Sequence, residues 1–587
     1  MTRVPPLALA FALAMTIAYA PDRFPRSDPS TAADELKGLW KAKLRFGPDA
    51  RGPLVIRREA TTYSADMMGR LLPVRVDGDE LSFELPRGEG AFRGMLQDDR
   101  TIRGVWIPPG SPAMGGRASP VVLTSEGADR WGGEVVPFED TFTFYLLIRE
   151  RPDGSLGAIL RNPERDFGAL LGVERVVRDG AVVKLLGRSR GETEEREIVR
   201  GSYDAESDVL SLAFPMRGGT YDFHREDDQS DFYPRGLNPA RYVYRPPLAR
   251  DDGWPTGTLE EAGIDRDTVE RSIQKIVDMP MDSLGVPLIH GLLIARHGKL
   301  VLEEYFHGEH RDRLHETRSA AKSVTATIVG AAIQAGEPLE IATPVYQVMN
   351  GGAFPADLEA RKRAMTLEHL LTMSSGYYCD DSDPEAPGRE DGMWDREEPD
   401  FVRYTLAVPM AFAPGDTAIY CSANPNLALG VVARAAGEFP LYLFDRLLAR
   451  PMRIERYGWT MDPGGNPYGG GGVQFLPRDF LKFGQLMLDD GMWQGRRILS
   501  SAFVERASSP LYRMGDRGYG YLWWGADMPY GGGTVSTFSA LGAGGQNLTV
   551  IPELDLVIAA FGGNYASRGW QYMQAEFIPE LVLPAVR

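Results

Sequence analysis

The sequence predicts a chain of two parts, a β-rich N-terminal region over residues 35–245 and an α+β domain over residues 258–587. Short apolar runs alternate with turn signals in the first part, whereas helical periodicity dominates the second. Strand patterns stand at both ends of the second part, which indicates that these ends meet in one antiparallel sheet. A chain of 587 residues is too long for one ordinary core, so two or three domains are expected.

The composition is that of a folded globular protein, with 43% hydrophobic and 25% charged residues. The net charge of −17 argues against nucleic acid or an anionic membrane as a partner.

The N-terminus predicts a secretory signal peptide over residues 1–20. Arg3 precedes an apolar run from Leu7 to Ala20 that ends in Ala-Tyr-Ala, a small-x-small cleavage pattern. The run is shorter than the roughly 20 residues that span a bilayer. We therefore expect a periplasmic or secreted protein. The alternative is a retained membrane anchor, favoured by the single basic residue and by Pro21 after the cut. No later segment is long and apolar enough to cross a membrane.

The N-terminal region is predicted to form a barrel or a sandwich. Asp-Gly pairs at 77–78, 153–154 and 179–180 lie between apolar runs and are hairpin signals. The segments "VDGDELSFEL" and "RDGAVVKLLG" resemble two copies of one module. The stretch 246–257, rich in proline, glycine and charge, reads as a linker. No role is predicted for this region.

The α+β domain opens with an amphipathic helix over 259–279 and two strands over 289–306. Helices follow until a strand pair over 547–562, and a final helix ends the chain.

A Ser-x-x-Lys pattern occurs twice. Ser272 and Lys275 lie within the amphipathic helix, where a solvated face explains both. Ser319 and Lys322 instead precede a run that is apolar at helical spacing and predicts a buried helix.

This second context is chemically suggestive. Ser319 would lie at the first turn, where free backbone N–H groups favour developing negative charge. Lys322 shares its helix face, and burial would lower the pKa of Lys322 toward a neutral amine. A hydroxyl beside such an amine is a nucleophile with its base. The alternative is a capping serine and a lysine that extends to solvent.

Four segments together resemble one family. They are "RSAAKSVTATIVG", "TLEHLLTMSSG", "FAPGDTAIYCSANPNLALG" and "YGGGGVQFLPRDFLKFGQLMLDDGMWQGRRIL". Over 258–587 the chain resembles the serine β-lactamases and penicillin-binding proteins, and within them the class C-like esterases and amide hydrolases. The resemblance implies a β-lactamase/DD-peptidase-like fold, an antiparallel sheet flanked by helices with a helical lobe.

The resemblance also implies roles. Ser319 matches the acylated nucleophile, Lys322 its partner in proton transfer, and Tyr420 the tyrosine that serves as base or relay. The family's Tyr-x-Asn is replaced, so either Ser422 or Asn424 fills its third position, and Ser422 is favoured.

The family's Lys-Thr-Gly motif is absent. A count back from "IPE" (551–553) places Thr537, Phe538 and Ser539 there, with Ser539 toward the substrate. Ala540 would then supply the second oxyanion N–H beside that of Ser319. Loss of the basic residue removes a ligand for the β-lactam carboxylate, so we expect an ester or a small amide as substrate. The alternatives are a β-lactamase or D-amino-acid peptidase, and a non-catalytic binding protein of the same fold.

The two cysteines, Cys379 and Cys421, are predicted to form a disulfide in an exported protein, and free buried thiols are the alternative. The acidic loop 379–401 reads as a solvated surface, although its position would also allow selection of a cationic or polar substrate.

His307, His310 and His315 match no metal-binding motif and are assigned to a solvated loop. No metal or organic cofactor is expected, and no G-x-S-x-G elbow supports a Ser-His-Asp mechanism. The run Gly469–Gly472 lacks the Lys-Ser/Thr of a phosphate-binding loop. The oligomeric state is not predicted.

Overall fold

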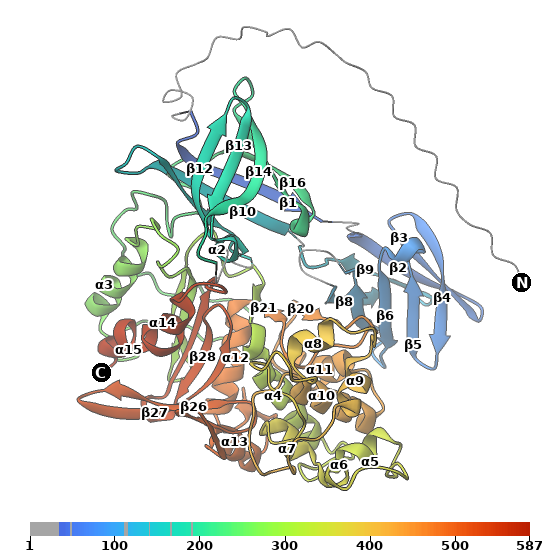
Figure 1. The fold of residues 1–587 in the computed structure, drawn as a ribbon. Helices are drawn as coiled ribbons and strands as arrows, with labels where there is room; N and C mark the ends of the chain where they lie inside the picture. Colours follow the sequence, from blue (N-terminus) through green and yellow to red (C-terminus); the bar gives the residue numbers. More distant parts are fainter. Residues whose placement is uncertain (1–34, 47–49, 111–115, 140, 165–166, 189–191) are drawn as a thin grey trace, which may run out of the picture.

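The computed structural model describes residues 35–46, 50–110, 116–139, 141–164, 167–188 and 192–587 (Figure 1). The predicted signal peptide, residues 1–20, lies outside them. The predicted fold class is confirmed: a β-rich region precedes a domain in which an antiparallel sheet packs against helices.

In the described part of the chain, the first β body is a meander of eight strands that closes on itself. Each strand pairs with the next in sequence, and β9 pairs with both β8 and β2. Its strands are β2 (Gly52–Glu59), β3 (Thr62–Met67), β4 (Arg70–Asp77), β5 (Glu80–Glu84), β6 (Ala91–Leu96), β7 (Ile102–Ile107), β8 (Arg117–Ser125) and β9 (Arg130–Val135). Alternate residues of these strands fill a core that includes Ile56, Phe92 and Trp106.

The second β body is a closed barrel. Its strands in the described residues are β1 (Gly38–Arg45), β10 (Thr141–Glu150), β11 (Leu156–Arg161), β12 (Val173–Asp179), β13 (Val182–Gly187), β14 (Arg196–Asp204), β15 (Val209–Phe214) and β16 (Gly219–Arg225). A short helix, α2 (Phe167–Leu171), lies beside β11. Because β1 pairs with both β10 and β16, the first body is an insertion between the first two strands of this barrel.

The two segments that suggest a repeat occupy equivalent places. "VDGDELSFEL" lies in the β4–β5 hairpin and "RDGAVVKLLG" in the β12–β13 hairpin. Each hairpin joins the third and fourth strands, counted from β2 in the first body and from β10 in the second.

The third body contains an antiparallel sheet of order β18-β17-β29-β28-β27-β26-β25-β24. These strands are β17 (Ile289–Arg296), β18 (Lys299–Tyr305), β24 (Tyr512–Met514), β25 (Arg517–Tyr519), β26 (Trp524–Tyr530), β27 (Gly533–Gly542), β28 (Gln546–Ile551) and β29 (Leu556–Gly562). Strands from both ends of the domain meet, as predicted, in the β17–β29 pair. A separate two-stranded sheet contains β22 (Met492–Trp493) and β23 (Arg496–Arg497).

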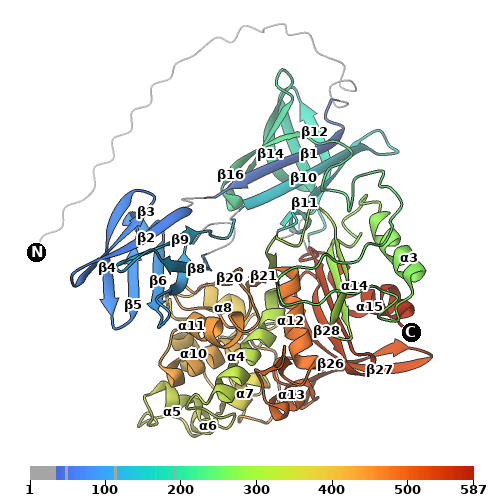
Figure 2. The same cartoon turned by 180° about the vertical axis from the view of Figure 1, so that it is seen from behind.

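The two faces of this sheet bury different helices because side chains alternate along a strand. Leu293 and Ala295 pack with α12 and the helical lobe, whereas Leu292 and Ile294 pack with α3 and α15 (Figure 2). The helices are α3 (Arg266–Val277), α4 (Ala321–Ala335), α5 (Val345–Met349), α6 (Ala360–Ala364), α7 (Leu367–Leu371), α8 (Glu390–Trp394), α9 (Phe401–Ala407), α10 (Ala423–Ala436), α11 (Pro440–Phe444), α12 (Pro477–Leu488), α13 (Ser501–Ser508), α14 (Gly569–Ala575) and α15 (Phe577–Leu581).

Helix α3 begins later than the predicted 259–279 because Asp265 caps it, accepting a hydrogen bond from the Thr268 amide. Ser272 lies on its buried face, so the predicted solvated position is wrong for this serine, whereas Lys275 is exposed as expected.

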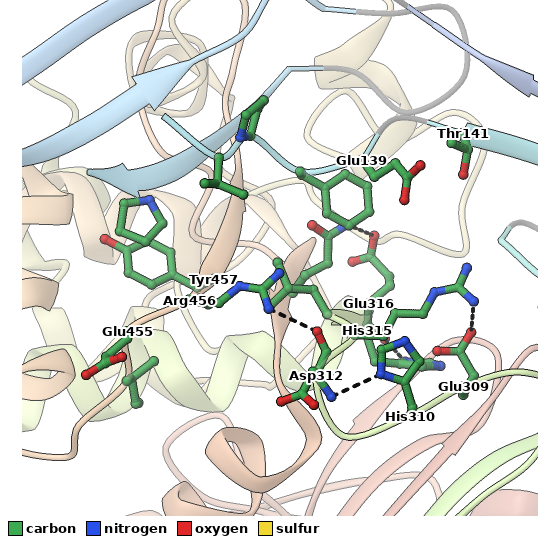
Figure 3. Close-up of a pocket in the computed structure, with 18 of the residues that line it drawn as sticks. Glu139, Thr141, Glu309, His310, Asp312, His315, Glu316, Glu455, Arg456 and Tyr457 are labelled. Carbon is green, nitrogen blue, oxygen red and sulfur yellow. Dashed lines mark hydrogen bonds and ion pairs between the residues drawn. The ribbon is translucent and has the colours of Figure 1, made fainter. Parts of the chain in front are cut away.

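The three bodies enclose a cavity of about 900 Å³ that is lined by residues of all three (Figure 3). Its walls carry arginine, histidine and carboxylate side chains, including Glu139, Glu309 and Arg456.

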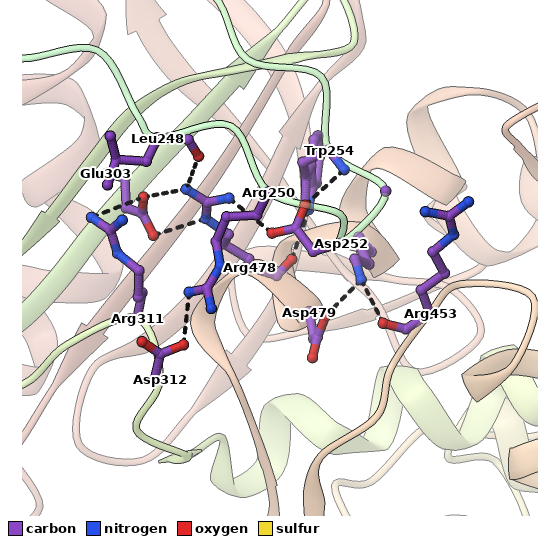
Figure 4. Close-up of polar contacts among 12 residues, drawn as sticks. Leu248, Arg250, Asp252, Trp254, Glu303, Arg311, Asp312, Arg453, Arg478 and Asp479 are labelled. Carbon is purple, nitrogen blue, oxygen red and sulfur yellow. Dashed lines mark hydrogen bonds and ion pairs between the residues drawn. The ribbon is translucent and has the colours of Figure 1, made fainter.

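The linker is held against the third body by a buried ionic network (Figure 4). Arg478 of α12 donates to both carboxylate oxygens of Glu303, at 2.9 and 2.6 Å, and to Asp252 at 2.8 Å. The indole of Trp254 donates to the Arg478 carbonyl at 2.9 Å. A guanidinium bound on two sides fixes the path of residues 248–254.

Strand β8 of the first body also continues into the third body. It pairs with β20 (Tyr457–Thr460), β20 pairs with β21 (Val473–Phe475), and β21 pairs with β19 (His315–Glu316). Arg117 at the start of β8 forms an ion pair with Glu316 at 2.8 Å, and the side chains are only 3% and 7% exposed. The inserted body therefore shares both a sheet and a buried charge pair with the segment that leads to Ser319.

Among the described residues, no single helix has the length and apolar character needed to cross a membrane. The pair α10 and Pro440–Ala449 meets these two criteria only when taken together, with a bend of 85°.

Replacing Arg117 with methionine is expected to destabilise the protein by about 3–5 kcal/mol, because the buried carboxylate of Glu316 loses the guanidinium that neutralises it. Chemical denaturation followed by tryptophan fluorescence measures this loss. Arg130→Met is the matched control, because its pair with Glu126 is 42% and 44% exposed and should cost less than about 1 kcal/mol. The double variant Arg117→Met/Glu316→Gln should recover part of the loss. Equal effects of Arg117→Met and Arg130→Met would contradict the role of the buried pair.

Candidate active site

Ser319 lies in a single 3₁₀ turn, Arg318–Ala320, directly before α4. Arg318 has a φ of 51°, a left-handed conformation that is unfavourable for a residue with a side chain. The turn is held from the outside by Thr317, whose amide donates to the Val473 carbonyl of β21 at 3.0 Å. The strained turn is thus fixed by the sheet that continues from the first β body.

Lys322 points back to Ser319 from the first turn of α4. Its ammonium group donates to Ser319 Oγ at 3.0 Å and to the Gly470 carbonyl at 2.5 Å. The residue is 2% exposed, and its Nζ lies 5.0 Å from the centre of the Tyr420 ring. The structure brings Ser319, Lys322 and Tyr420 together, as the sequence predicts.

The charge of Lys322 differs from the expectation. Burial works to lower the pKa of Lys322, but Tyr420, Glu390 and Asp381 outweigh it, and the pKa is raised above its usual value. The prediction of a neutral amine is therefore wrong, because it considered burial without the acidic neighbours. Lys322 is an ammonium at neutral pH and acts as a donor in this site.

The glycine run explains how the lysine is held. Gly470 presents its carbonyl to Lys322, and the Gly472 amide donates to the Arg318 carbonyl at 3.3 Å. A side chain on Gly470 would lie 2.3 Å from the Tyr468 hydroxyl, so this position has no room for one. The sequence of this run excludes a phosphate-binding loop, but no local pattern in it predicts the contact with Lys322.

Tyr420 is packed by aromatic rings of the sheet edge. Its ring stacks on Trp524 of β26, with 5.6 Å between the centres and 23° between the planes. Trp524 in turn packs edge-on against Tyr519. These contacts hold the ring of Tyr420 beside Lys322.

Asp381 fixes the segment that carries Tyr420. Its carboxylate accepts from the Ser422 amide at 2.9 Å and from the Ser422 hydroxyl at 2.6 Å, and its own amide donates to the Tyr420 carbonyl at 3.0 Å. The other carboxylate oxygen accepts from the Glu390 amide at 2.9 Å. Asp381 was missed because it is one of many acidic residues in the loop 379–401.

The predicted disulfide is present between Cys379 and Cys421, which flank Asp381 and Tyr420 in sequence. The crosslink and the carboxylate together join the acidic loop to the tyrosine segment.

The predicted substrate-binding residues lie in buried positions. The Ser422 hydroxyl donates a hydrogen bond to the Asp381 carboxylate. Asn424 lies in the first turn of α10, where its side-chain amide nitrogen is 3.7 Å from Met373 Sδ. Ser539 forms a hydrogen bond of 2.7 Å with Thr549 on the neighbouring strand. The hydroxyls of Ser422 and Ser539 thus hold the fold, whereas the buried Asn424 Oδ1 has no hydrogen-bond partner among the described residues.

The residue of β27 that meets the nucleophile turn is Gly542. A Cβ on Gly542 would lie 2.3 Å from the Thr317 carbonyl oxygen and 3.1 Å from the Ala320 amide nitrogen. Ala540, predicted as the oxyanion residue, is buried in the core two residues earlier in the strand. Gly542 is therefore the position at which β27 approaches Ser319.

The histidine loop differs from its prediction. His307 and His315 are buried, and only His310 of the three is exposed. The prediction that these histidines lie in a solvated loop is therefore wrong for His307 and His315. They are covered because the loop lies between the third body and the two β bodies.

Residues 274–562 match the family model described as Beta-lactamase. This domain belongs to the serine β-lactamase and penicillin-binding-protein superfamily. A relative, the 6-aminohexanoate-dimer hydrolase of Paenarthrobacter ureafaciens, is 27% identical over 306 residues, which cover 48% of this chain and 75% of that protein. The β-lactamase-family domain is a hydrolase domain.

Solved structures are also similar to this chain. A putative 6-aminohexanoate-dimer hydrolase from Bacillus anthracis has 19% identity and a TM-score of 0.41, with 49% of this chain and 77% of that chain covered. EstCE1, described as a hydrolase with promiscuous acyltransferase activity, has 16% identity and a TM-score of 0.41, with coverage of 53% and 98%.

Gly542→Ala is expected to slow labelling of the protein by a fluorophosphonate probe and to destabilise it by about 1–3 kcal/mol, because the new methyl group overlaps the Thr317 carbonyl. Labelling rates and denaturation curves measure both effects. Gly533→Ala, in the same strand, is the control, because a Cβ there would meet nothing closer than 3.8 Å. Unchanged labelling of Gly542→Ala would show that this contact does not position Ser319.

Reduction of the disulfide is expected to lower the melting temperature, because a crosslink across 42 residues contributes about 3–4 kcal/mol in the chain-entropy model. Activity should fall further than stability alone explains, since Cys421 adjoins Tyr420. The control is the variant Cys379→Ala/Cys421→Ala, which should not respond to the reductant. Two thiols that titrate in the oxidised, unfolded protein would rule the disulfide out.

Proposed function

We propose that the domain is a serine hydrolase that acts through an acyl-enzyme on an ester or a small amide. The observation that carries this proposal is the contact of 3.0 Å between the buried Lys322 Nζ and Ser319 Oγ, which lies in a half-buried, strained turn. Ser319 is the nucleophile, and water later releases the acyl group.

Tyr420 relays the proton: it gives its own phenolic proton to the leaving group and takes up the proton of Ser319 in return. Lys322 is already protonated, so it assists by stabilising negative charge on Tyr420 and by orienting Ser319 Oγ. This division of roles follows from the raised pKa of Lys322.

The oxyanion is bound by the Ser319 amide and by a second amide at the end of β27. Because Gly542 is the residue that contacts the turn, we assign this second donor to Ala543, the exposed residue that follows, in place of Ala540. The nucleophile turn and β27 would then hold the developing charge from two sides.

The substrate class rests on two observations. The position of the family's basic Lys-Thr-Gly motif carries no lysine, which disfavours β-lactams. The relative whose name gives 6-aminohexanoate dimer as its substrate supports a small amide as well as an ester. The disulfide supports an oxidising location outside the cytoplasm.

Ser319→Ala is expected to abolish both fluorophosphonate labelling and hydrolysis of p-nitrophenyl esters, because no acyl-enzyme can form. Ser272→Ala, the matched control from the other Ser-x-x-Lys, should remain near wild type. Equal effects of the two changes would mean that the nucleophile lies elsewhere, and a wild-type protein that is not labelled would favour a binding protein without catalysis.

Lys322→Ala and Tyr420→Phe are each expected to lower the ester hydrolysis rate by about 10²-fold or more, with the circular dichroism spectrum unchanged. Steady-state kinetics measure the loss. A Tyr420→Phe variant with wild-type rates would show that another group accepts the proton of Ser319.

A further inference from the structure

Three side chains that could bind a metal ion converge in the wall of the cavity between the three bodies (Figure 3). His290 comes from β17, Glu309 from the loop after β18, and His315 from β19. One possible ligand atom from each lies within 4.8 Å of the others.

The hydrogen bonds fix the tautomers of the two histidines. His315 Nδ1 lies 3.0 Å from the Glu316 carbonyl oxygen, which can only accept, so Nδ1 carries the proton and Nε2 has a lone pair. His290 Nδ1 lies 2.8 Å from that Nε2 and must donate to it. His290 Nε2 is then an unprotonated nitrogen that is buried and finds no hydrogen-bond partner among the described residues.

Both histidines line the cavity, so a ligand can reach them from that side. Glu309 is the one carboxylate of the three, and its ion-pair partner Arg313 lies 3.3 Å away.

We propose that His290, Glu309 and His315 bind a divalent transition-metal ion of the Zn²⁺ type, with an open coordination position toward the cavity. Two imidazoles and one carboxylate are a ligand set that Zn²⁺ uses when a fourth position is left for water or a small ligand. The ion takes the place of the proton between His290 Nδ1 and His315 Nε2, and this proton moves to His290 Nε2, so that both imidazoles stay neutral. With Zn–N distances of about 2.0–2.1 Å, their two nitrogens separate from 2.8 Å to about 3.3 Å.

The site is independent of the proposed hydrolysis at Ser319, because its ligands face the cavity and include none of the groups assigned to that reaction. The groups that orient two of the ligands are in place: the Glu316 carbonyl accepts from His315 Nδ1, and Arg313 pairs with Glu309.

The test is calorimetric titration of the chelator-treated full chain with Zn²⁺. We expect one ion per chain and at least about 100-fold weaker binding in Glu309→Gln and in His315→Gln, since loss even of a group that only orients a ligand costs 10–100-fold. His310→Gln is the matched control, because His310 lines the same cavity but is exposed and lies outside the cluster. Circular dichroism shows that each variant is folded.

Co²⁺ provides a second readout that needs no variant. The wild-type protein should develop the intense visible bands of a four-coordinate Co²⁺ site, and Zn²⁺ should displace them. Absence of stoichiometric binding in the wild type, or binding that Glu309→Gln leaves unchanged, would overturn the proposal.

Discussion

The buried ammonium of Lys322 is the interaction on which the candidate site depends. Burying a lysine is costly unless its charge is matched, and here Ser319, the Gly470 carbonyl and the charges of Asp381 and Glu390 match it. Each of these partners needs support of its own. The glycine run lies against the nucleophile turn, and the disulfide and Asp381 hold the loop that carries the acidic groups.

The inserted β body also helps to position the nucleophile turn. The segment that enters the nucleophile turn is an edge of the sheet that begins in the inserted β body, and Glu316 in it is neutralised by Arg117 from that body. Glu316 lies three residues before Ser319, and its buried counter-charge comes from the inserted body. A domain that was only linked to the hydrolase domain would not be expected to supply such a charge. The structure thus gives the β-rich region a physical role in positioning the nucleophile.

Local patterns in the sequence were enough to predict the fold class, the contact between Ser319 and Lys322, and the disulfide. The apolar run after Ser319 marks a buried helix, and paired strands at both ends of the domain mark a shared sheet. Contacts between distant segments were not predictable in this way. The charge of Lys322 depends on Asp381 and Glu390, which lie far away in sequence, and His315 is buried by packing between bodies. The approach of Gly542 depends on the geometry of a strand end, which a residue count cannot supply.

The central claim is that Ser319 is acylated. Peptide mapping by mass spectrometry after reaction of the intact protein with a fluorophosphonate or a p-nitrophenyl ester tests it most directly. The account predicts one adduct per chain, on the peptide that contains Ser319 and on that side chain. An adduct on another residue, or none in a folded protein with its disulfide intact, would contradict it.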